Sequence, residues 1–356
     1  MRTTRRRIAG ALLLPLLALV VTGCTDSDDE TASTGDDAAE TAPETTARPD
    51  DAPETCVEAD AVDPPAEGDD APAPEEAAAE FTFRPLDAGG PLTKAALESG
   101  DIDVGLLFSS DGAIVANDWV ALEDDQDLQP ADNFVPAIRN DACTDEVTAV
   151  LDALSAELTV EDMQEMVAAV SIDGDNPDAV AEAFLAEKEL PGDLTAEGSI
   201  TVGSSNFAES NIAAQLYGQV LAAAGVDVEY KADIGARDVY FTALESGEID
   251  LVPEFTGTLL AFLDGEAEPS PDLDVTLAAL RTVAADRGIS ILEPAEADSV
   301  NTFVVTGETA EELDLTTVSD LAGVDEELTL GGPPECPERP YCLIGLEESY
   351  GLRFAS

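Results

Sequence analysis

The chain has 356 residues, with 77 acidic side chains, 15 basic ones and no histidine, which gives a formal net charge of −62. Its length allows two or three compact units, and a hydrophobic fraction of 44% is enough for a folded core. Nucleic acid is an implausible partner because phosphate binding needs a basic face. Without histidine, His-dependent catalysis and imidazole metal ligation are excluded.

The first 23 residues have the pattern of an export signal. A basic start is followed by the apolar stretch 8–21, which is too short to span a membrane comfortably. The stretch ends in Val-Thr-Gly before Cys24, which resembles the lipobox of bacterial lipoproteins. We therefore predict a lipoprotein signal peptide over 1–23 and lipidation of Cys24. An ordinary signal peptide with an incidental cysteine is the alternative, and a faint twin-arginine pattern at Arg5 and Arg6 leaves the export route open.

Residues 24–80 lack hydrophobic periodicity and are rich in Asp, Glu, Ala, Pro and Thr. Such a segment cannot bury enough apolar area to offset the entropy of ordering it. We expect a flexible, self-repelling linker that holds a folded body at some distance from a lipid anchor.

Four further cysteines fit an exported protein. Cys336 and Cys342 flank a five-residue loop that a disulfide could close in an oxidising compartment. A disulfide between Cys56 and Cys143 is inferred only by elimination, since these are the two cysteines that remain. A metal site is not expected, because too few ligands of the right type lie nearby.

Two segments of the body repeat each other, at 96–112 and 243–258. Each has the pattern of a helix end, a glycine, a short buried strand and a polar loop. Two copies indicate two similar α/β lobes rather than a solenoid. Ligands bind where loops leave the carboxyl ends of strands in open α/β sheets, so the loops at 108–111 and 255–258 are candidates to face one cleft. The alternative is two similar loops that share no ligand.

The elements around the second repeat fit this plan. Residues 199–203 and 226–230 are predicted strands, and the segment 209–224 between them is a predicted helix. The free amides at this helix start could hold a carboxylate or another anion, although no glycine-rich phosphate motif is present. Further helices are predicted over 178–188 and 273–287 and within 144–170.

Several segments together resemble the substrate-binding proteins of ABC importers for glycine betaine, choline and related quaternary amines. They are 200–207, 243–258, 334–340 and 346–352, joined by 108–112 and 122–125. The resemblance implies a two-lobed α/β fold of the periplasmic-binding-protein kind (type II-like). Each lobe would be a mixed sheet flanked by helices, with the ligand cleft between the lobes. It also implies a binding protein rather than an enzyme, with no cofactor.

The order of the segments departs from the family. Residues 81–190 resemble the C-terminal half of the binding domain and 199–356 the N-terminal half, with 191–198 as a connector. A circular permutation, a truncated tandem and a domain-swapped pair of chains are the three explanations, and permutation is favoured because the halves are complementary.

A permuted chain would build one lobe from both of its ends. Residues 301–356 and 81–112 would form that lobe, and residues 113–190 and 199–298 would form the other.

The family cages the quaternary ammonium with aromatic faces. By position, Phe108 and Phe255 lie where the family often has tyrosine, and Asn301 and Lys94 occupy two other cage positions. A lysine repels a cation, so either the ligand is not a simple betaine or other residues complete the cage. Lys94 could instead pair with nearby acids as a surface charge.

Carboxylate recognition is also altered. Ser205 lies where the family often has a lysine, whereas Arg339 matches an arginine that grips a carboxylate from the other lobe. Tyr240 is a further aromatic candidate for the cleft. The predicted ligand-binding residues are Lys94, Phe108, Ser109, Ser205, Asn206, Phe207, Tyr240, Phe255, Thr256, Thr258, Asn301 and Arg339.

The sequence therefore predicts an extracytoplasmic lipoprotein on the outer face of the cell membrane. It would capture a small zwitterionic or cationic osmoprotectant by lobe closure and deliver it to an ABC permease, as a monomer without metal or cofactor. A cleft adapted to a non-betaine ligand and a non-transporting sensor or interaction lipoprotein are the alternatives.

Overall fold

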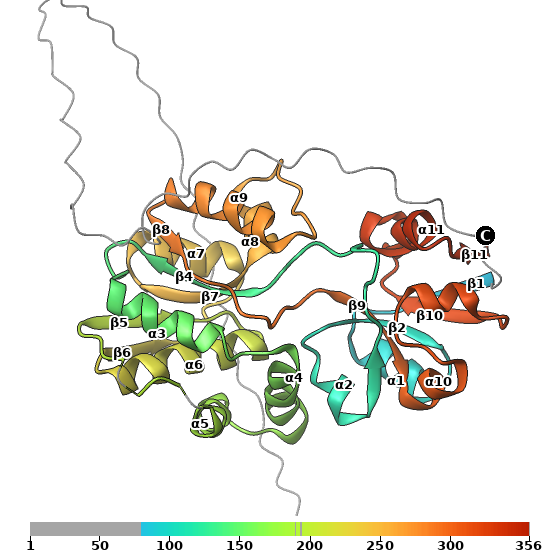
Figure 1. The fold of residues 1–356 in the computed structure, drawn as a ribbon, viewed down its shortest axis with the longest axis horizontal. Helices are drawn as coiled ribbons and strands as arrows, with labels where there is room; N and C mark the ends of the chain where they lie inside the picture. Colours follow the sequence, from blue (N-terminus) through green and yellow to red (C-terminus); the bar gives the residue numbers. More distant parts are fainter. Residues whose placement is uncertain (1–79, 189, 193, 356) are drawn as a thin grey trace, which may run out of the picture. The chain divides into compact units, whose positions relative to one another are not determined.

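The computed structural model describes residues 80–188, 190–192 and 194–355, which form two α/β lobes, each around its own sheet (Figure 1). Lobe 1 comprises residues 80–121 and 301–355, and lobe 2 comprises the described residues of 134–291. The predicted signal peptide, Cys24 and the acidic linker lie outside the described residues.

The sheet of lobe 1 is built from both ends of the described chain. β1, β10 and β2 pair in parallel, and β9 and β3 continue the sheet in antiparallel pairing. In order, the strands are β11 (Arg353–Phe354), β1 (Glu80–Pro85), β10 (Leu328–Gly332), β2 (Val104–Phe108), β9 (Asn301–Thr306) and β3 (Trp119–Ala121).

The sheet of lobe 2 repeats this plan within one continuous stretch of chain. Two parallel pairs, β6–β5 and β5–β7, are followed by the antiparallel pairs β7–β4 and β4–β8. In order, the strands are β6 (Asp227–Lys231), β5 (Ser199–Gly203), β7 (Leu251–Phe255), β4 (Phe134–Arg139) and β8 (Ile289–Ile291). β2 and β7, which end the two copies of the repeat, therefore hold the same place in their sheets.

Helices cover the sheets. Lobe 1 has α1 (Pro91–Glu98), α2 (Gly112–Ala116), α10 (Gly307–Leu313) and α11 (Gly345–Ser349). Lobe 2 has α3 (Asp145–Ser155), α4 (Val160–Ala168), α5 (Pro177–Glu187), α6 (Ala208–Ala224), α7 (Arg237–Ser246), α8 (Thr256–Leu263) and α9 (Leu273–Ala285). The helices predicted at 178–188, 209–224 and 273–287 are confirmed within two residues at each end. Within the described ranges, no helix is long and apolar enough to cross a membrane.

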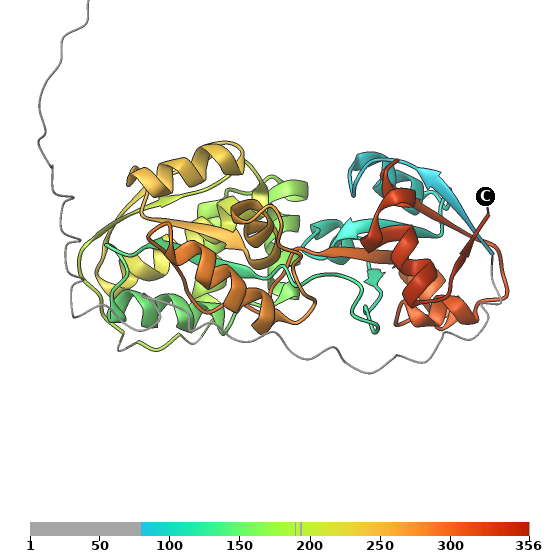
Figure 2. The same ribbon diagram turned by 90° about the horizontal axis from the view of Figure 1, so that it is seen from above.

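Alternation along β4 shows why both faces of the lobe 2 sheet are covered. Phe134 and Ile138 pack with α3 and α6, whereas Val135 and Ala137 pack with α7 and α9. Side chains two residues apart share a face of a strand, so a strand that is apolar throughout needs helices on both sides. Figure 2 shows the helices on the two sides of this sheet.

The repeat folds into the same helix–turn–strand unit in both lobes. Gly100 and Gly247 follow α1 and α7 with φ of 72° and 76°, a left-handed conformation that glycine adopts without a steric cost. Ile102 and Ile249 are buried directly after these turns. The short buried strands predicted in the two copies follow as β2 and β7.

An aspartate then fixes each strand to its neighbour. The amide of Thr329 in β10 donates to Asp103 Oδ2 at 2.7 Å, and the amide of Thr201 in β5 donates to Asp250 Oδ2 at 2.9 Å. The repeat therefore encodes a strand junction that is used twice.

Two crossover segments, 122–133 and 292–300, join the lobes. They run antiparallel where Asn133 bridges Asp298, and the amide of Ser299 donates to the carbonyl of Asp132 at 3.1 Å. The expected lobe boundary after residue 112 is wrong. Residues 113–121 belong to lobe 1, because β3 adds to the edge of β9 and extends the first sheet.

The lobes also meet where α2 faces α4. A Cβ on Gly112 would lie 2.3 Å from the amide nitrogen of Ala168, so only glycine allows this approach. Beside it, Gln164 Nε2 donates to the carbonyl of Ser109 at 2.7 Å. This contact keeps α2 of lobe 1 against α4 of lobe 2.

Candidate ligand cleft

A cavity of about 460 Å³ is lined by both lobes. Lobe 1 contributes two of the predicted ligand residues, Lys94 and Phe108. The remaining lining residues are Glu98, Ser110, Asp111, Gly112, Ala113, Asn117 and Trp119 from lobe 1, and Val167, Ser171, Ile172, Ala208 and Glu209 from lobe 2. A cavity shared by two lobes is the arrangement expected of a binding cleft.

Lys94 is paired rather than free. Its ammonium lies 2.6 Å from Asp111 Oδ2, and Asp111 also caps α2 by accepting from the amide of Ala113 at 2.9 Å. The alternative interpretation of Lys94, as a cation neutralised by a neighbouring acid, therefore describes its contacts, although the residue still lines the cavity.

Glu209 approaches the cavity from the first turn of α6 and was not among the predicted residues. Burial raises the pKa of its carboxyl, and the negative charge of Asp111 on the other lobe raises it further, against a hydrogen bond from its own backbone amide. One feature of the sequence points to Glu209 as a cavity residue: it lies two residues after the segment 200–207, which resembles the family.

Phe108 presents its ring at the end of β2, with 42% of the residue exposed. Asn301 lies opposite Phe108 in the antiparallel register of β2 and β9. The amide group of Asn301 donates to Gln129 Oε1 at 3.4 Å, which links it to the first crossover segment.

The hydroxyl of Ser109 bonds to the second crossover segment and is not free for a ligand. Its hydroxyl donates to Asp298 Oδ1 at 2.5 Å and accepts from the amide of Val300 at 3.0 Å. Burial raises the pKa of Asp298, while the bond from Ser109 lowers it. Ser110 makes a matching hydroxyl contact with Ser299 at 3.0 Å.

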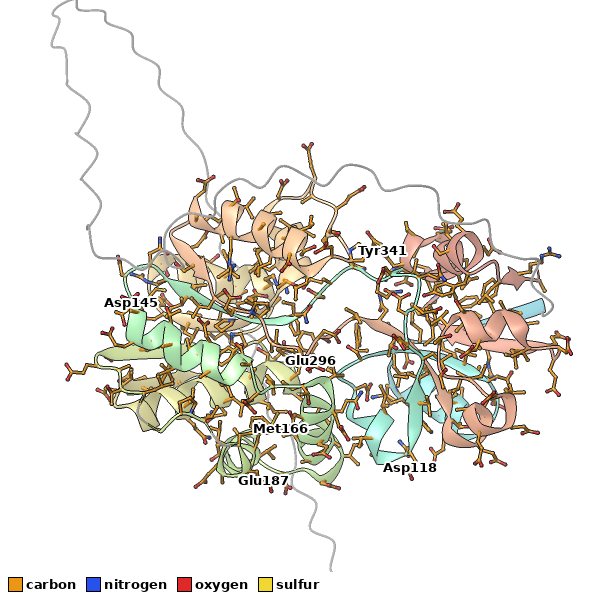
Figure 3. All side chains as sticks on the ribbon, in the orientation of Figure 1. Asp118, Asp145, Met166, Glu187, Glu296 and Tyr341 are labelled. Carbon is orange, nitrogen blue, oxygen red and sulfur yellow. A yellow bond between two sulfur atoms is a disulfide. The ribbon has the colours of Figure 1, made fainter. Side chains whose placement is uncertain are left out.

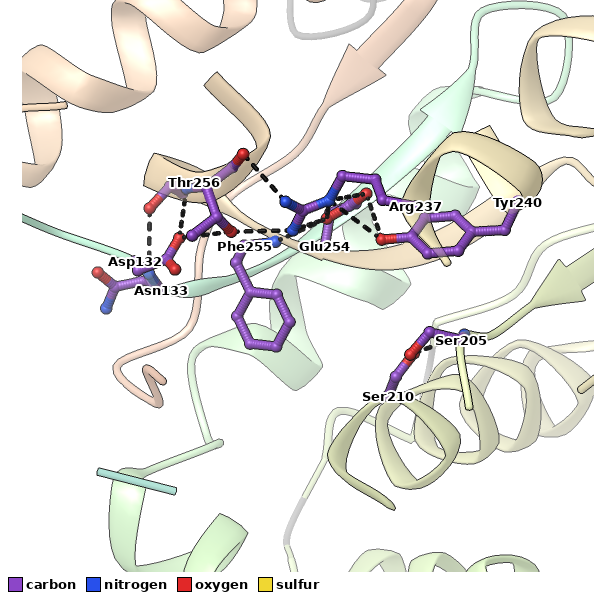
Figure 4. Close-up of polar contacts among 10 residues, drawn as sticks. Asp132, Asn133, Ser205, Ser210, Arg237, Tyr240, Glu254, Phe255 and Thr256 are labelled. Carbon is purple, nitrogen blue, oxygen red and sulfur yellow. Dashed lines mark hydrogen bonds and ion pairs between the residues drawn. The ribbon is translucent and has the colours of Figure 1, made fainter. Parts of the chain in front are cut away.

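A buried ionic cluster lies at the end of β7 in lobe 2 (Figure 4). Glu254 is fully buried, and it accepts from Arg237 Nη2 at 2.9 Å and from the hydroxyl of Tyr240 at 2.8 Å. Burial raises the pKa of Glu254, and the guanidinium opposes that shift. Tyr240 is buried with its hydroxyl engaged here, so its contacts are those of a structural residue.

The cluster extends to the first crossover segment. Arg237 Nη2 donates to Thr258 Oγ1 at 2.8 Å, and the amide of Thr258 donates to Asp132 Oδ1 at 2.8 Å. Burial raises the pKa of Asp132 to about 6, although the bonds from Thr258 and the charge of Arg237 act against it. Thr256 is wholly buried, and its hydroxyl accepts from the amide of Asn133 at 3.0 Å.

The remaining lobe 2 candidates lie at the ends of β5 and β7. Phe255 packs on Phe134 with ring centroids 4.6 Å apart, and its ring points away from the Glu254 carboxylate in Figure 4. Ser205 is buried, and its hydroxyl accepts from the amide of Phe207 at 3.3 Å. Asn206 is exposed, and Phe207 is 62% exposed at the start of α6.

Arg339 is exposed and pairs with Glu335 at 2.8 Å, so it does not line the described cavity. The Cys336–Cys342 disulfide closes its loop. The carbonyl of Tyr341 in the same loop accepts from Gln129 Nε2 at 3.0 Å and so connects the loop to the first crossover segment. Tyr341 is labelled in Figure 3.

The last predicted groups concern cysteines and metals. Cys143 is not free, and its expected pairing with Cys56 involves a residue outside the described ranges, so that pairing stays a prediction. Among residues 80–188, 190–192 and 194–355, no group of three His, Cys, Asp or Glu side chains could hold a metal ion.

Two α/β lobes, two crossovers and a shared cavity match the two-lobed fold of solute-binding proteins. The sequence model of one protein family, the substrate binding domain of ABC-type glycine betaine transport systems, matches residues 75–187 and 198–356 of this chain. The chain belongs to that family, whose members act outside the cytoplasm in ABC importers.

Individual relatives match over part of the chain. The glycine betaine-binding protein YehZ of Escherichia coli (strain K12) is 29% identical over 175 residues, which is 48% of this chain and 57% of that protein. A glycine-betaine-binding protein of Pseudomonas aeruginosa is 28% identical over 165 residues, 44% of this chain and 52% of its own. The chain thus spans about half the length of the curated relatives it matches.

Solved structures give distant similarities. NikA from Brucella suis in complex with Fe(III)-EDTA has a TM-score of 0.34 and 12% identity, covering 61% of this chain and 55% of that one. An ancestral arginine-binding protein bound to arginine has a TM-score of 0.27 and 16% identity, covering 65% and 69%.

Proposed function

We propose that this chain is the binding component of an ABC importer that captures a small osmoprotectant such as glycine betaine or choline. The observation that carries the proposal is the cavity between the lobes, into which Phe108 presents an exposed ring. An aromatic face attracts a quaternary ammonium through its quadrupole and tolerates its methyl groups. The family membership supports the same class of ligand.

Ligand capture would proceed by closure of the lobes about the two crossover segments. Ser109 and Asp132 tie these segments to the lobes, so closure would pivot there without unfolding either sheet. Phe255, Asn301 and Arg339 stay predicted ligand residues that closure would have to bring toward the cavity. The same holds for Ser205, Asn206 and Phe207 at the start of α6.

The closed, loaded form would then dock on a membrane permease as a monomer. Lipidation of Cys24 would anchor the protein to the outer face of the membrane, with residues 24–80 as the linker. Both features rest on the sequence pattern alone.

We also propose that residues 81–190 and 199–356 are the two halves of one binding domain in circularly permuted order. The strand pairing supports this, because β1 and β2 from the first segment pair with β10 and β9 from the second. The two segments therefore supply complementary parts of a single sheet.

A thermal-shift and calorimetric screen of the mature chain with glycine betaine, choline, carnitine and ectoine tests the function. A ligand at 100 times its Kd should add about 2.7 kcal/mol to the free energy of unfolding. Phe108→Ala should then weaken binding by roughly tenfold, as expected for a lost cation–π contact. A cooperative melt that no compound shifts would contradict the proposed ligand class.

Phe262→Ala is the matched control. Phe262 is 42% exposed, as Phe108 is, but it lies on α8 and packs on Phe241 outside the cavity. It should leave the affinity unchanged. Equal losses in both variants would show that the effect of Phe108 is not local to the cavity.

A further inference from the structure

The charges that line the cavity are unbalanced. Among the described residues that line it, Lys94 is the one basic side chain, and it faces three carboxylates, those of Glu98, Asp111 and Glu209. Since Lys94 lies 2.6 Å from Asp111, the charges of these two residues largely offset each other, and the carboxylates of Glu98 and Glu209 remain in excess. The cavity thus offers a ligand an excess of negative charge.

Two of these carboxylates face each other from opposite lobes. Asp111 caps α2 in lobe 1, and Glu209 lies in the first turn of α6 in lobe 2. They are close enough for the charge of Asp111 to raise the pKa of Glu209. Like charges oppose the approach of the lobes, whereas a cation between them would turn this repulsion into attraction on both sides.

Among the residues that the structure describes, the cavity offers no unpaired basic side chain to a ligand carboxylate. Arg339 is exposed and paired with Glu335, and Lys94 is engaged by Asp111. Ser205, which replaces the family's lysine, is buried with its hydroxyl bonded locally. A zwitterion would therefore place its carboxylate against Asp111 or Glu209 without a basic partner.

We propose that the ligand of this cleft is a small organic cation that carries no carboxylate, and that Glu209, together with Asp111, determines this specificity. The inference rests on the proposed function and narrows it. Phe108 supplies the aromatic face for the cation, and Glu209 supplies the opposite charge from the other lobe.

The pH dependence of binding should follow Glu209. A cation binds the ionised carboxylate better, so affinity should rise with pH through the raised pKa of Glu209 and then level off. The charged groups that face Glu209 are Lys94 and Glu98 on α1 and Asp111 on α2.

Calorimetry with choline and glycine betaine separates the alternatives, because the two share a trimethylammonium group and differ in the carboxylate. We expect the mature wild-type chain to bind choline at least tenfold more tightly. Glu209→Gln should lower choline affinity by roughly tenfold, reduce the preference over glycine betaine, and flatten the rise of affinity with pH.

Glu308→Gln is the matched control, since Glu308 is an exposed glutamate in the first turn of α10, away from the cavity. It should leave both affinities and the pH profile unchanged, and thermal melts verify that each variant is folded. Equal or tighter binding of glycine betaine by the wild type would overturn the inference and leave the proposed function standing. If the folded chain binds neither of these compounds, nor carnitine or ectoine, the proposed function falls with the inference.

Discussion

The two lobes share one sheet plan but differ in what they place at the end of the repeated strand. In lobe 2, β7 ends with the buried Glu254, which Arg237 holds from the start of α7. In the aligned repeat, lobe 1 has Leu107 and Gly90 at these two positions. Lobe 1 instead presents Phe108 to the cavity, whereas Phe255 of lobe 2 packs on its own core.

The comparison distinguishes the residues that form the sheet from the polar side chains at the ends of its strands. Both lobes retain the turn glycine, the buried isoleucine and the aspartate that fixes the neighbouring strand. The polar side chains at the carboxyl ends of the strands diverge. Lobe 2 holds the first crossover segment with a buried ionic cluster. Lobe 1 holds the second with the hydroxyls of Ser109 and Ser110, and it also lines the cavity with Asp111.

The largest expected effect follows from removing the ionic cluster of lobe 2. Arg237→Ala would leave Glu254 buried without its guanidinium, so the free energy of unfolding should fall by about 3–5 kcal/mol. Urea denaturation measures this loss. Arg84→Ala in lobe 1 is the control, because Arg84 makes an exposed pair with Asp101 that should contribute at most about 1 kcal/mol. Similar losses in both variants would contradict the asymmetry.

The crossover end of the cluster should make stability depend on pH. Because burial raises the pKa of Asp132 from 3.8 to about 6, the folded state holds this proton more tightly than the unfolded state does. The wild type should therefore lose stability relative to Asp132→Asn as pH rises from 4 to 6. Integrated over the shift, the change is on the order of 3 kcal/mol.

Urea midpoints of the two proteins at several pH values measure this difference. Taking the difference cancels the acids that both proteins retain. A constant offset across the range would show that Asp132 titrates normally.

The Cys336–Cys342 disulfide should stabilise lobe 1 alone. Replacing Cys336 and Cys342 with serine releases a short loop, which should cost about 2 kcal/mol on the chain-entropy account. Trp119, the chain's single tryptophan, lies in β3 and reports on lobe 1. Its fluorescence transition should move to lower urea, while far-UV dichroism, which includes lobe 2, moves less. Coincident shifts would mean that the lobes unfold as one unit.

The smallest expected effect tests the shared junction. Asp103→Ala and Asp250→Ala each remove an acceptor for a neighbouring strand amide, so each should cost about 1–2 kcal/mol. The loss at Asp250 should be the larger, since its carboxylate also lies 3.7 Å from Arg139. If either substitution is neutral, the two junctions are not equivalent.

Local pattern predicted the repeat, the elements around it and the two-lobe plan. These features depend on turn glycines and apolar alternation, which act between residues close in sequence. The local pattern did not predict the lobe boundary, because that boundary depends on a strand that pairs with a segment far away in the sequence. β3 joins lobe 1 only because the edge of β9 is available to Val120, and no property of residues 119–121 specifies that edge.

The candidate site was less predictable for the same reason. Resemblance drew attention to Lys94 and Phe108, but it could not show that Lys94 is paired with Asp111. Glu209 and Glu254 are ordinary acids in the sequence, and only the fold buries them. Burial and pairing depend on residues that lie far away along the chain.

The origin of lobe 1 from both chain ends has a consequence for the order of folding. Phe81 in β1 pairs opposite Leu328 in β10, so this strand must wait for a partner that is synthesised well after it. The strands of lobe 2 all lie within 134–298 and can assemble earlier. Closing the longer loop costs more chain entropy and slows sheet formation. Until then, β1 and β2 expose unpaired apolar edges, so a nascent chain should be most prone to aggregate through these two strands.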